Sequence, residues 1–379
     1  MRLDAGGQNE EEPARSLDVG AKRSDAEALC SEVEDKSSVV GYLREEIVPP
    51  SLACEAAAGA DRLGRRGAKG VIMHCISRVV LATALLLGIT GFGEAQPLRF
   101  GVLSDVDSLP YLVADEEGLY SKAGVEVKLV RFQSPVERDA AFQAGTVDGV
   151  IGDVLGAALA VDHGFPVVIV AATDGRYLLL ASPSSPAKTP ADLAGVPIGG
   201  STNTVIHYMV WRFLTDAGVT PADVKVLAVP KMPVRLEMLL GGQLAAASLP
   251  EPLATVALAR GARLLADSDH LGADPGVILF NKTFAETHRS AVAGVLKAGA
   301  LAGAAINADN DRYRDFLVKK AGFPEAVRNT FRFVTYWPPR LPSDAAITAI
   351  VGWMQSQGLV KTALPVEALV DRRVLAEVK

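Results

Sequence analysis

The sequence has few cysteines, and its larger part has none. Only three occur in the 379 residues, Cys30, Cys54 and Cys75, and all of them precede Gln96. The stretch from Gln96 onward therefore forms no disulfide and contains no zinc–thiolate site and no cysteine nucleophile. The absence of free thiols also suits an oxidising compartment.

Metal-binding spacing, catalytic signatures and basic runs are also missing. His163, His207, His270 and His288 show no spacing typical of metal ligands. No phosphate-loop, dinucleotide-binding, zinc-protease or serine-hydrolase motif occurs. Residues 96–379 carry 29 acids and 27 bases, without a basic patch. We therefore expect no metal, no cofactor, no catalysis and no nucleic-acid partner.

The clearest local pattern is an export signal at residues 73–95. Arg78 precedes the apolar run Val79–Ile89, and small residues follow it just before Gln96. This pattern is typical of a cleaved signal peptide, and the run is short for a membrane anchor or a buried helix. We therefore predict a periplasmic protein, and we interpret residues 1–72 as a disordered leader or a misassigned start.

Beyond Gln96, apolar strands alternate with helices, which predicts an α/β fold with parallel crossovers. Two units, residues 141–175 and 237–269, resemble each other. Each has a helix ending in glycine, a short apolar strand, an acid (Asp153 or Glu251) and a second helix. Open α/β sheets bind ligands at the carboxyl ends of their strands. The two acidic strand ends therefore predict two lobes that face each other across one cleft.

The order of segments also predicts the lobe boundaries. Lobe 1 is expected at 97–181 plus 275–379, and lobe 2 at 182–274. The Pro/Ser-rich connector 182–190 is interpreted as a crossing between the lobes. A single helix is expected over 109–121, and the helical tail from Ala291 onward is expected to pack back on lobe 1.

Several segments together resemble the NMT1/THI5-like group of periplasmic substrate-binding proteins of ABC importers. The segments that carry the resemblance are LPYLVADEEGLYSKAGVEVKLVRF, FQAGTVDGVIGD, TPADLAGVPIGGSTNT, LLGGQLAAASLPEP and IVGWMQSQGLV with PVEALVDRRVL. The group includes binders of thiamine pyrimidine precursors, alkanesulfonates, taurine and nitrate. The resemblance implies the two-lobed periplasmic-binding-protein fold (type II), in which each lobe is a mostly parallel sheet flanked by helices and a two-strand hinge joins the lobes. It also implies a monomer that closes on a small-molecule ligand and docks on an ABC permease in the inner membrane.

Candidate ligand-binding residues lie at strand ends, near the hinge and in the tail. They are Asp105, Asp107, Ser108, Gln133, Asp153, Thr173, Gly200, Ser201, Thr202, Asn203, Glu251 and Tyr336. The carboxylates and hydroxyls could instead cap helices, and Asp153 could do both. The turn Gly200–Asn203 could bind an anionic group through its backbone N–H groups. Glu251 is the strongest candidate, because Pro250 and Pro252 stiffen its turn and the resemblance places that turn at the cleft.

The charges of these candidates favour one class of ligand. Four acids stand against one arginine, Arg176, which could pair with Asp174 instead. We therefore expect a neutral or amine-bearing solute, such as an aminopyrimidine thiamine precursor, whose ring would stack on aromatic side chains. Tyr208 and Trp211 are candidates for that stacking or for the core. The alternatives are an anion such as taurine, an alkanesulfonate or nitrate, a pyrimidine-synthase-like enzyme, and a sensor lobe.

Overall fold

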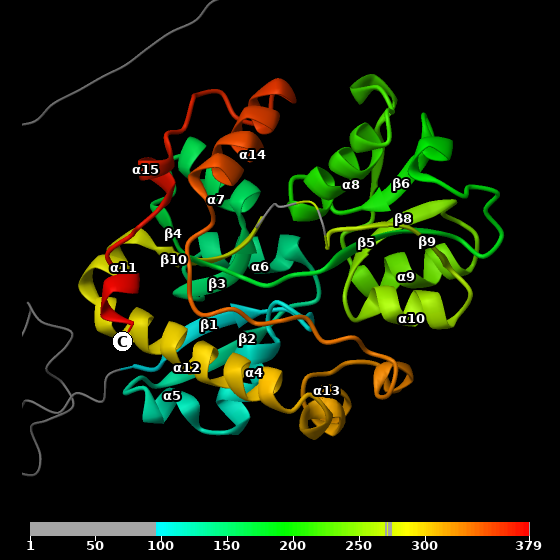
Figure 1. The fold of residues 1–379 in the computed structure, drawn as a ribbon. Helices are drawn as coiled ribbons and strands as arrows, with labels where there is room; N and C mark the ends of the chain where they lie inside the picture. Colours follow the sequence, from blue (N-terminus) through cyan, green and yellow to red (C-terminus); the bar gives the residue numbers. More distant parts are fainter. Residues whose placement is uncertain (1–95, 270, 272–274, 379) are drawn as a thin grey trace, which may run out of the picture. The chain divides into compact units, whose positions relative to one another are not determined.

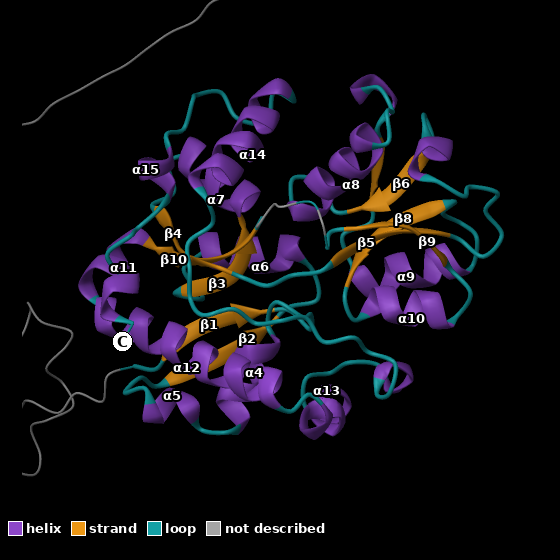
Figure 2. Cartoon of the chain, in the orientation of Figure 1, coloured by secondary structure: helices purple, strands orange, loops and turns teal. Residues whose placement is uncertain are grey.

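The computed structural model describes residues 96–378 apart from 270 and 272–274. The predicted signal peptide (73–95) and leader (1–72) lie outside the described residues. The described residues form two five-stranded sheets, and helices cover both faces of each sheet (Figures 1 and 2). This is the predicted α/β class with two lobes.

The first sheet has the strand order β2-β1-β3-β10-β4. Its strands are β1 (Leu98–Val102), β2 (Val127–Arg131), β3 (Gly149–Asp153), β4 (Val167–Ala172) and β10 (Gly276–Asn281). β1 pairs in parallel with β2 and β3, whereas β10 runs antiparallel between β3 and β4. β3 and β4 are buried along their whole length, as expected for strands covered on both faces.

Helices from both ends of the described chain cover this sheet. One face carries α4 (Leu109–Glu116), α5 (Leu119–Lys122) and α12 (Arg289–Ala308); the other carries α6 (Pro135–Gln143), α7 (Val154–Asp162) and α14 (Asp344–Ser356). The single helix expected over 109–121 is divided, because Gly118 adopts a left-handed φ of 64° that ends α4.

One helix of the described chain, α12, is long and apolar enough to cross a membrane by length and composition alone. Its small and apolar residues, from Val292 to Ile306, are buried against α4 and α5. Its apolar character is therefore explained by the core of the first lobe.

The second sheet has the order β7-β6-β8-β5-β9. Its strands are β5 (Tyr177–Ala181), β6 (Pro197–Gly200), β7 (Lys225–Ala228), β8 (Ala246–Pro250) and β9 (Arg263–Asp267). One face carries α8 (Val205–Asp216), and the other carries α9 (Met232–Leu240) and α10 (Leu253–Ala259). β5 is the antiparallel strand here, as β10 is in the first sheet.

The position of β5 corrects the predicted lobe boundaries. β5 pairs with β8 and β9, so it belongs to the second lobe and not to the first. The boundary after residue 181 is therefore wrong, and the chain leaves the first sheet after Ala172 and returns to it at Gly276. The connector 182–190 joins β5 to β6 within one sheet, so its interpretation as a crossing is also wrong. The first crossing is residues 173–176, and the structure describes residues 268, 269, 271 and 275 of the second.

The helical tail packs on the first lobe, as predicted. After α11 (Lys282–Thr287), α12 and α13 (Arg314–Lys319), helix α14 contacts α7, and α15 (Val366–Leu369) contacts β4. α14 also reaches the second lobe, because Trp353 lies with its ring centroid 5.3 Å from that of Tyr208 and 5.9 Å from that of Trp211 on α8. Tyr208 and Trp211 thus pack against the tail, as the core alternative expected.

Candidate ligand-binding site

A cavity of about 640 Å³ lies where the chain crosses between the sheets. Its lining comes from the first crossing and the start of β5, from the end of β9 and the second crossing, and from the tail. The lining residues are Thr173, Asp174, Gly175, Arg176, Tyr177, Asp267, Ser268, Asp269, Pro275, Gly276, Arg332, Phe333, Val334, Thr335, Trp337 and Arg340. This volume suits a small organic solute.

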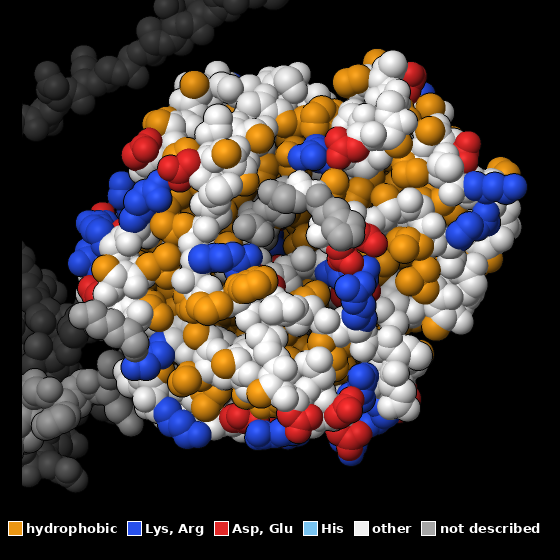
Figure 3. All heavy atoms as spheres, viewed as in Figure 1, with side chains coloured by type: hydrophobic (Ala, Val, Ile, Leu, Met, Phe, Trp, Pro, Cys, Tyr) orange, Lys and Arg blue, Asp and Glu red, His pale blue; other side chains and the backbone are white. Residues whose placement is uncertain are grey.

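The cavity lining combines charges of both signs with aromatic rings. Three arginines and three aspartates contribute, together with Tyr177, Phe333 and Trp337. Trp337 is 60% exposed, which is unusual for so large an apolar side chain. On the face drawn in Figure 3, acidic and basic side chains lie beside hydrophobic ones near the middle of the surface. Such a lining can bind a solute that has both a charged group and an apolar part.

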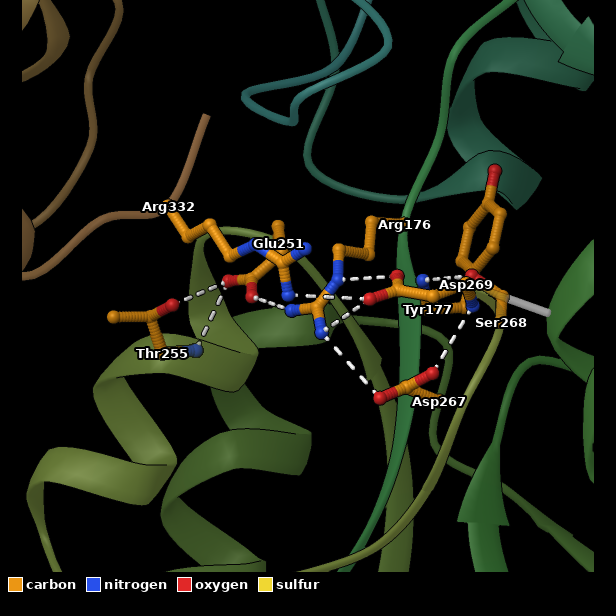
Figure 4. Close-up of polar contacts among 8 residues, drawn as sticks. All are labelled: Arg176, Tyr177, Glu251, Thr255, Asp267, Ser268, Asp269 and Arg332. Carbon is orange, nitrogen blue, oxygen red and sulfur yellow. Dashed lines mark hydrogen bonds and ion pairs between the residues drawn. The ribbon is translucent and has the colours of Figure 1, made fainter. Parts of the chain in front are cut away.

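Arg176 is held by one acid that follows β8 and by two acids at the end of β9 (Figure 4). Its Nη1 donates to Glu251 Oε1 at 2.9 Å and its Nε donates to Asp269 Oδ1 at 2.6 Å, while Asp267 lies 3.5 Å from Nη2. The Arg176 side chain is 11% exposed. Charge-assisted bonds of this kind are the stronger ones in proteins. Arg176 therefore pairs with these acids, whereas Asp174 pairs with Arg340. Arg176 fixes the wall of the cavity formed by the second lobe.

Glu251 is engaged within the protein. Besides its ion pair with Arg176, the other carboxylate oxygen accepts bonds from the Thr255 backbone N–H at 3.0 Å and the Thr255 hydroxyl at 2.8 Å. Its side chain is 1% exposed. Glu251 thus holds the turn between β8 and α10 and the Arg176 side chain, and it does not line the cavity.

The tail is anchored over the first crossing. Arg340 forms an ion pair of 2.9 Å with Asp174, which also accepts the Trp337 backbone N–H at 3.0 Å. The buried hydroxyl of Tyr336 donates to the Val106 carbonyl at 3.0 Å. Tyr336 therefore fastens the tail to the loop after β1, while its neighbour Trp337 lines the cavity.

Asp107 lies directly beneath the cavity floor. It is 4% exposed, and it accepts hydrogen bonds from the Thr173 hydroxyl and, at 3.2 Å, from the Tyr177 hydroxyl. Burial, followed by the charge of Asp105, raises the pKa of Asp107 to about 7. Asp105 itself accepts the Ser108 backbone N–H at 3.0 Å, and burial raises its pKa also.

Asp153 and its surroundings form the cleft edge of the first lobe. Asp153 caps α7 by accepting the Gly156 N–H at 2.8 Å, and its carboxylate lies 3.8 Å from the Arg138 guanidinium. Burial raises the pKa of Asp153, while Arg138 and the N–H groups of Gly156 and Val205 oppose that shift. Val205 is the first residue of α8, so Asp153 approaches the second lobe. The Val106 N–H also donates across the lobes, to the Glu251 carbonyl at 3.2 Å.

The glycine-rich turn before α8 is partly buried. Gly200 and Ser201 are buried, whereas Thr202 and Asn203 are exposed. Asn203 adopts a left-handed φ of 59°, and its N–H donates to His207 Nδ1 at 3.2 Å. The turn therefore lies at the strand end that the sequence predicts, outside the lining of the cavity at the crossings.

A buried arginine lies behind this turn. Arg235 on α9 hydrogen-bonds to the Ser201 hydroxyl and donates to the Ser248 carbonyl at 2.8 Å. Burial lowers the pKa of Arg235 to about 9. Arg138 occupies the equivalent place in the first lobe, where it donates to the Ile151 carbonyl at 3.0 Å. In both lobes the arginine binds a strand carbonyl 13 residues further along the chain, which extends the similarity of the two units.

The structure therefore brings together only part of the candidate set. Thr173 lines the cavity and Asp107 supports its floor, while Gln133 is exposed and its N–H donates to the Glu137 carboxylate. Arg332 and Arg340 lie outside the candidate set. The sequence feature that could have identified them is a tail segment, RFVTYWPPR, in which two arginines flank aromatic residues. Among the residues that the structure describes, no group of three or more His, Cys, Asp or Glu side chains could hold a metal ion.

Comparison with known proteins places the chain among two-lobed proteins. The model of the NMT1-like family matches residues 92–318. The chain belongs to the NMT1-like family. A putative aliphatic sulfonates-binding protein of Escherichia coli (strain K12) is 25% identical over 284 residues, which cover 72% of this chain and 88% of that protein.

Solved structures show that this NMT1-like chain has the type II periplasmic-binding-protein fold. The alkanesulfonate-binding protein SsuA from Xanthomonas axonopodis pv. citri, bound to MOPS, matches with a TM-score of 0.65 at 22% identity, covering 74% of this chain and 99% of SsuA. The desulfurization enzyme DSZB matches with a TM-score of 0.55 at 17% identity, and the match covers 75% of this chain and 99% of DSZB. Both binding proteins and an enzyme therefore share this fold, so the function must be argued from the site.

Proposed function

We propose that this protein is the periplasmic solute-binding component of an ABC importer and that it captures an organic solute with an anionic group, such as a sulfonate. The observation that carries the proposal is the cavity at the crossings, where Arg332 and Arg340 lie beside Trp337 and Phe333. Guanidinium groups bind oxyanions by charge-assisted hydrogen bonds, and the rings offer apolar surface to the organic part.

The acids that favoured an amine-bearing ligand have protein partners. Asp105 and Asp153 bind backbone N–H groups, while Asp107 and Glu251 bind side chains of the first crossing, of β5 and of α10. The excess of acids over arginines among the candidates therefore no longer argues for an amine. Arg332, in contrast, is 73% exposed and has an ion pair of 3.3 Å with Asp269. An anion could approach its guanidinium from solvent.

The position of the cavity explains how binding would be coupled to closure. In this proposal residues 173–176 and the described residues of the second crossing act as the hinge, and the tail of the first lobe contacts them through the Arg340–Asp174 and Arg332–Asp269 ion pairs. A solute that contacts both lobes stabilises the arrangement in which they are close, by its differential affinity for that state. A permease could then recognise the closed protein. The sulfonate-binding relatives support this assignment.

An amine-bearing solute is the second candidate, because Asp267 and Asp269 also line the cavity. Both already lie within 3.5 Å of Arg176 nitrogens, so an ammonium group would have to share them. These carboxylates are also only 25% and 22% exposed, whereas Arg332, although paired with Asp269, is 73% exposed and more accessible to an anion.

Calorimetry on the full chain tests the proposal, with ethanesulfonate, nitrate and an aminopyrimidine as probes. We expect ethanesulfonate to bind. The substitution Arg332→Gln should lower its affinity about tenfold or more, because it removes one charge-assisted hydrogen bond. Arg312→Gln is the matched control, because Arg312 is 60% exposed and pairs with Glu117 outside the cavity. Binding of the aminopyrimidine alone, or equal binding by wild type and Arg332→Gln, would overturn the proposal. Recovery of a chemically altered probe would favour an enzyme.

A further inference from the structure

A small side pocket adjoins the cavity at the crossings. Its volume is about 30 Å³, and Thr173, Asp174 and Trp337 line both spaces. Its remaining lining includes Asp107 from the loop after β1 and Tyr111 from α4. One water-sized group needs about 10–15 Å³ of such space, so the side pocket has room for about one or two non-hydrogen atoms.

The hydroxyl of Tyr111 is available to a group in this pocket. Tyr111 is 8% exposed, and among the described residues it hydrogen-bonds through its backbone alone. Gly299 of α12 also lines the pocket, and a Cβ atom there would lie 3.0 Å from the Tyr111 hydroxyl oxygen. The glycine therefore leaves open the space beside the hydroxyl. A buried hydroxyl without a partner costs free energy, which a hydrogen-bonding group in the pocket would recover.

The other polar groups of the pocket are mainly acceptors. Asp107 and Asp174 contribute carboxyl groups, and their charges, after burial, raise the pKa of Tyr111, so its hydroxyl stays neutral. The Asp107 carboxyl accepts hydrogen bonds from Thr173 and Tyr177. An ionised carboxylate has about four acceptor positions, so Asp107 can accept further bonds. The pocket therefore suits a group that donates hydrogen bonds and disfavours an anion or an apolar end.

The side pocket lies next to the place proposed for the anionic group. Arg340 lines the larger cavity and forms its ion pair of 2.9 Å with Asp174, which lines both spaces. The Trp337 side chain, which lines both spaces as well, offers apolar surface between them. A short solute whose anionic group contacts Arg340 can therefore extend along Trp337 into the side pocket.

We propose that the side pocket is a subsite for a compact hydrogen-bond donor, a hydroxyl or an ammonium group, at the end of the solute away from its anionic group, and that Tyr111 determines this specificity. The donor binds the Asp107 carboxyl and the Tyr111 hydroxyl oxygen. An apolar end of the same size leaves both without a bond, which penalises such a solute. This inference rests on the proposed function, which places the anionic group at Arg332 and Arg340.

Calorimetry of the full chain with three sulfonates of matched length tests the subsite. Propanesulfonate ends in a methyl group, where 2-hydroxyethanesulfonate has a hydroxyl and 2-aminoethanesulfonate has an ammonium group. We expect one of the two donor-bearing probes to bind about tenfold or more tightly than propanesulfonate, and the tighter of them identifies the donor. If neither bound more tightly than propanesulfonate, the proposal would be overturned.

The substitution Tyr111→Phe removes the hydroxyl and keeps the ring. It should reduce the preference for the donor-bearing probe over propanesulfonate about fivefold or more. Thermal unfolding should show that the variant folds, because the hydroxyl has no bond to a described residue. Tyr313→Phe is the matched control, since Tyr313 is also buried but its hydroxyl donates to Glu117, outside both cavities. The same preference in wild type and Tyr111→Phe would contradict the role of Tyr111.

A probe without an anionic group separates this inference from the proposed function. If no sulfonate binds, the proposed function has failed, and methylammonium still tests the side pocket. Because a ligand of the folded state stabilises it, methylammonium should raise the melting temperature of wild type more than that of Tyr111→Phe. Tetramethylammonium, which has no N–H group and is larger than the pocket, should not distinguish the two proteins. Equal shifts with methylammonium would overturn the inference.

Discussion

Replacing Glu251 by glutamine tests whether this acid is structural. The change removes a buried negative charge whose partner, Arg176, lies at 2.9 Å and is 11% exposed. Removing one partner of a buried pair costs about 3–5 kcal/mol when the other is left without compensation. Asp269 still binds Arg176 through two hydrogen bonds, so the expected cost is lower, about 2–3 kcal/mol.

Denaturant unfolding of the full chain measures this loss, and Glu237→Gln supplies the matched control. Glu237 makes an ion pair of 2.6 Å with Arg260, but both side chains are at least half exposed, so the same substitution there should cost under about 1 kcal/mol. If Glu251→Gln destabilised the protein no more than Glu237→Gln, the structural role of Glu251 would be refuted. A ligand-binding role would then be the better account.

Two further substitutions probe the hinge and the second lobe. Gly276→Ala places a Cβ against Thr173 Oγ1 of the first crossing, so it should destabilise the chain by about 1–3 kcal/mol and weaken solute binding. Denaturant unfolding and calorimetry measure these effects, and wild-type behaviour would contradict the packing of β10 against the first crossing. Arg235→Met removes the donor to the buried Ser248 carbonyl and should destabilise the protein by about 1–3 kcal/mol, as measured by thermal unfolding. An unchanged melting temperature would show that the buried arginine contributes nothing to stability.

Much of the fold follows from local patterns that the sequence displays. Apolar strands alternate with helices that end at left-handed glycines such as Gly145 and Gly242, and these positions predict both repeated units. The assignment of β5 failed for a physical reason. The strand Tyr177–Ala181 is uniformly apolar and buried, so nothing in it distinguishes pairing with β4 from pairing with β8 and β9.

The site was less predictable than the fold, because pairing between distant side chains decides it. The sequence places Glu251 at a strand end, but Arg176, which engages it, lies 75 residues away. Similarly, Asp107 reaches the hinge only because Tyr177, 70 residues further on, belongs to the other lobe. The tail that contributes Arg332 carries no spacing that relates it to the crossings.

A crystal structure of the protein with a bound alkanesulfonate tests the central claim most directly, because it locates the solute. We predict that the sulfonate group lies in the cavity at the crossings, within hydrogen-bond distance of Arg332 or Arg340, with its organic part against Trp337. A sulfonate bound at the Gly200–Asn203 turn opposite Asp153, with the cavity at the crossings empty, would contradict the account.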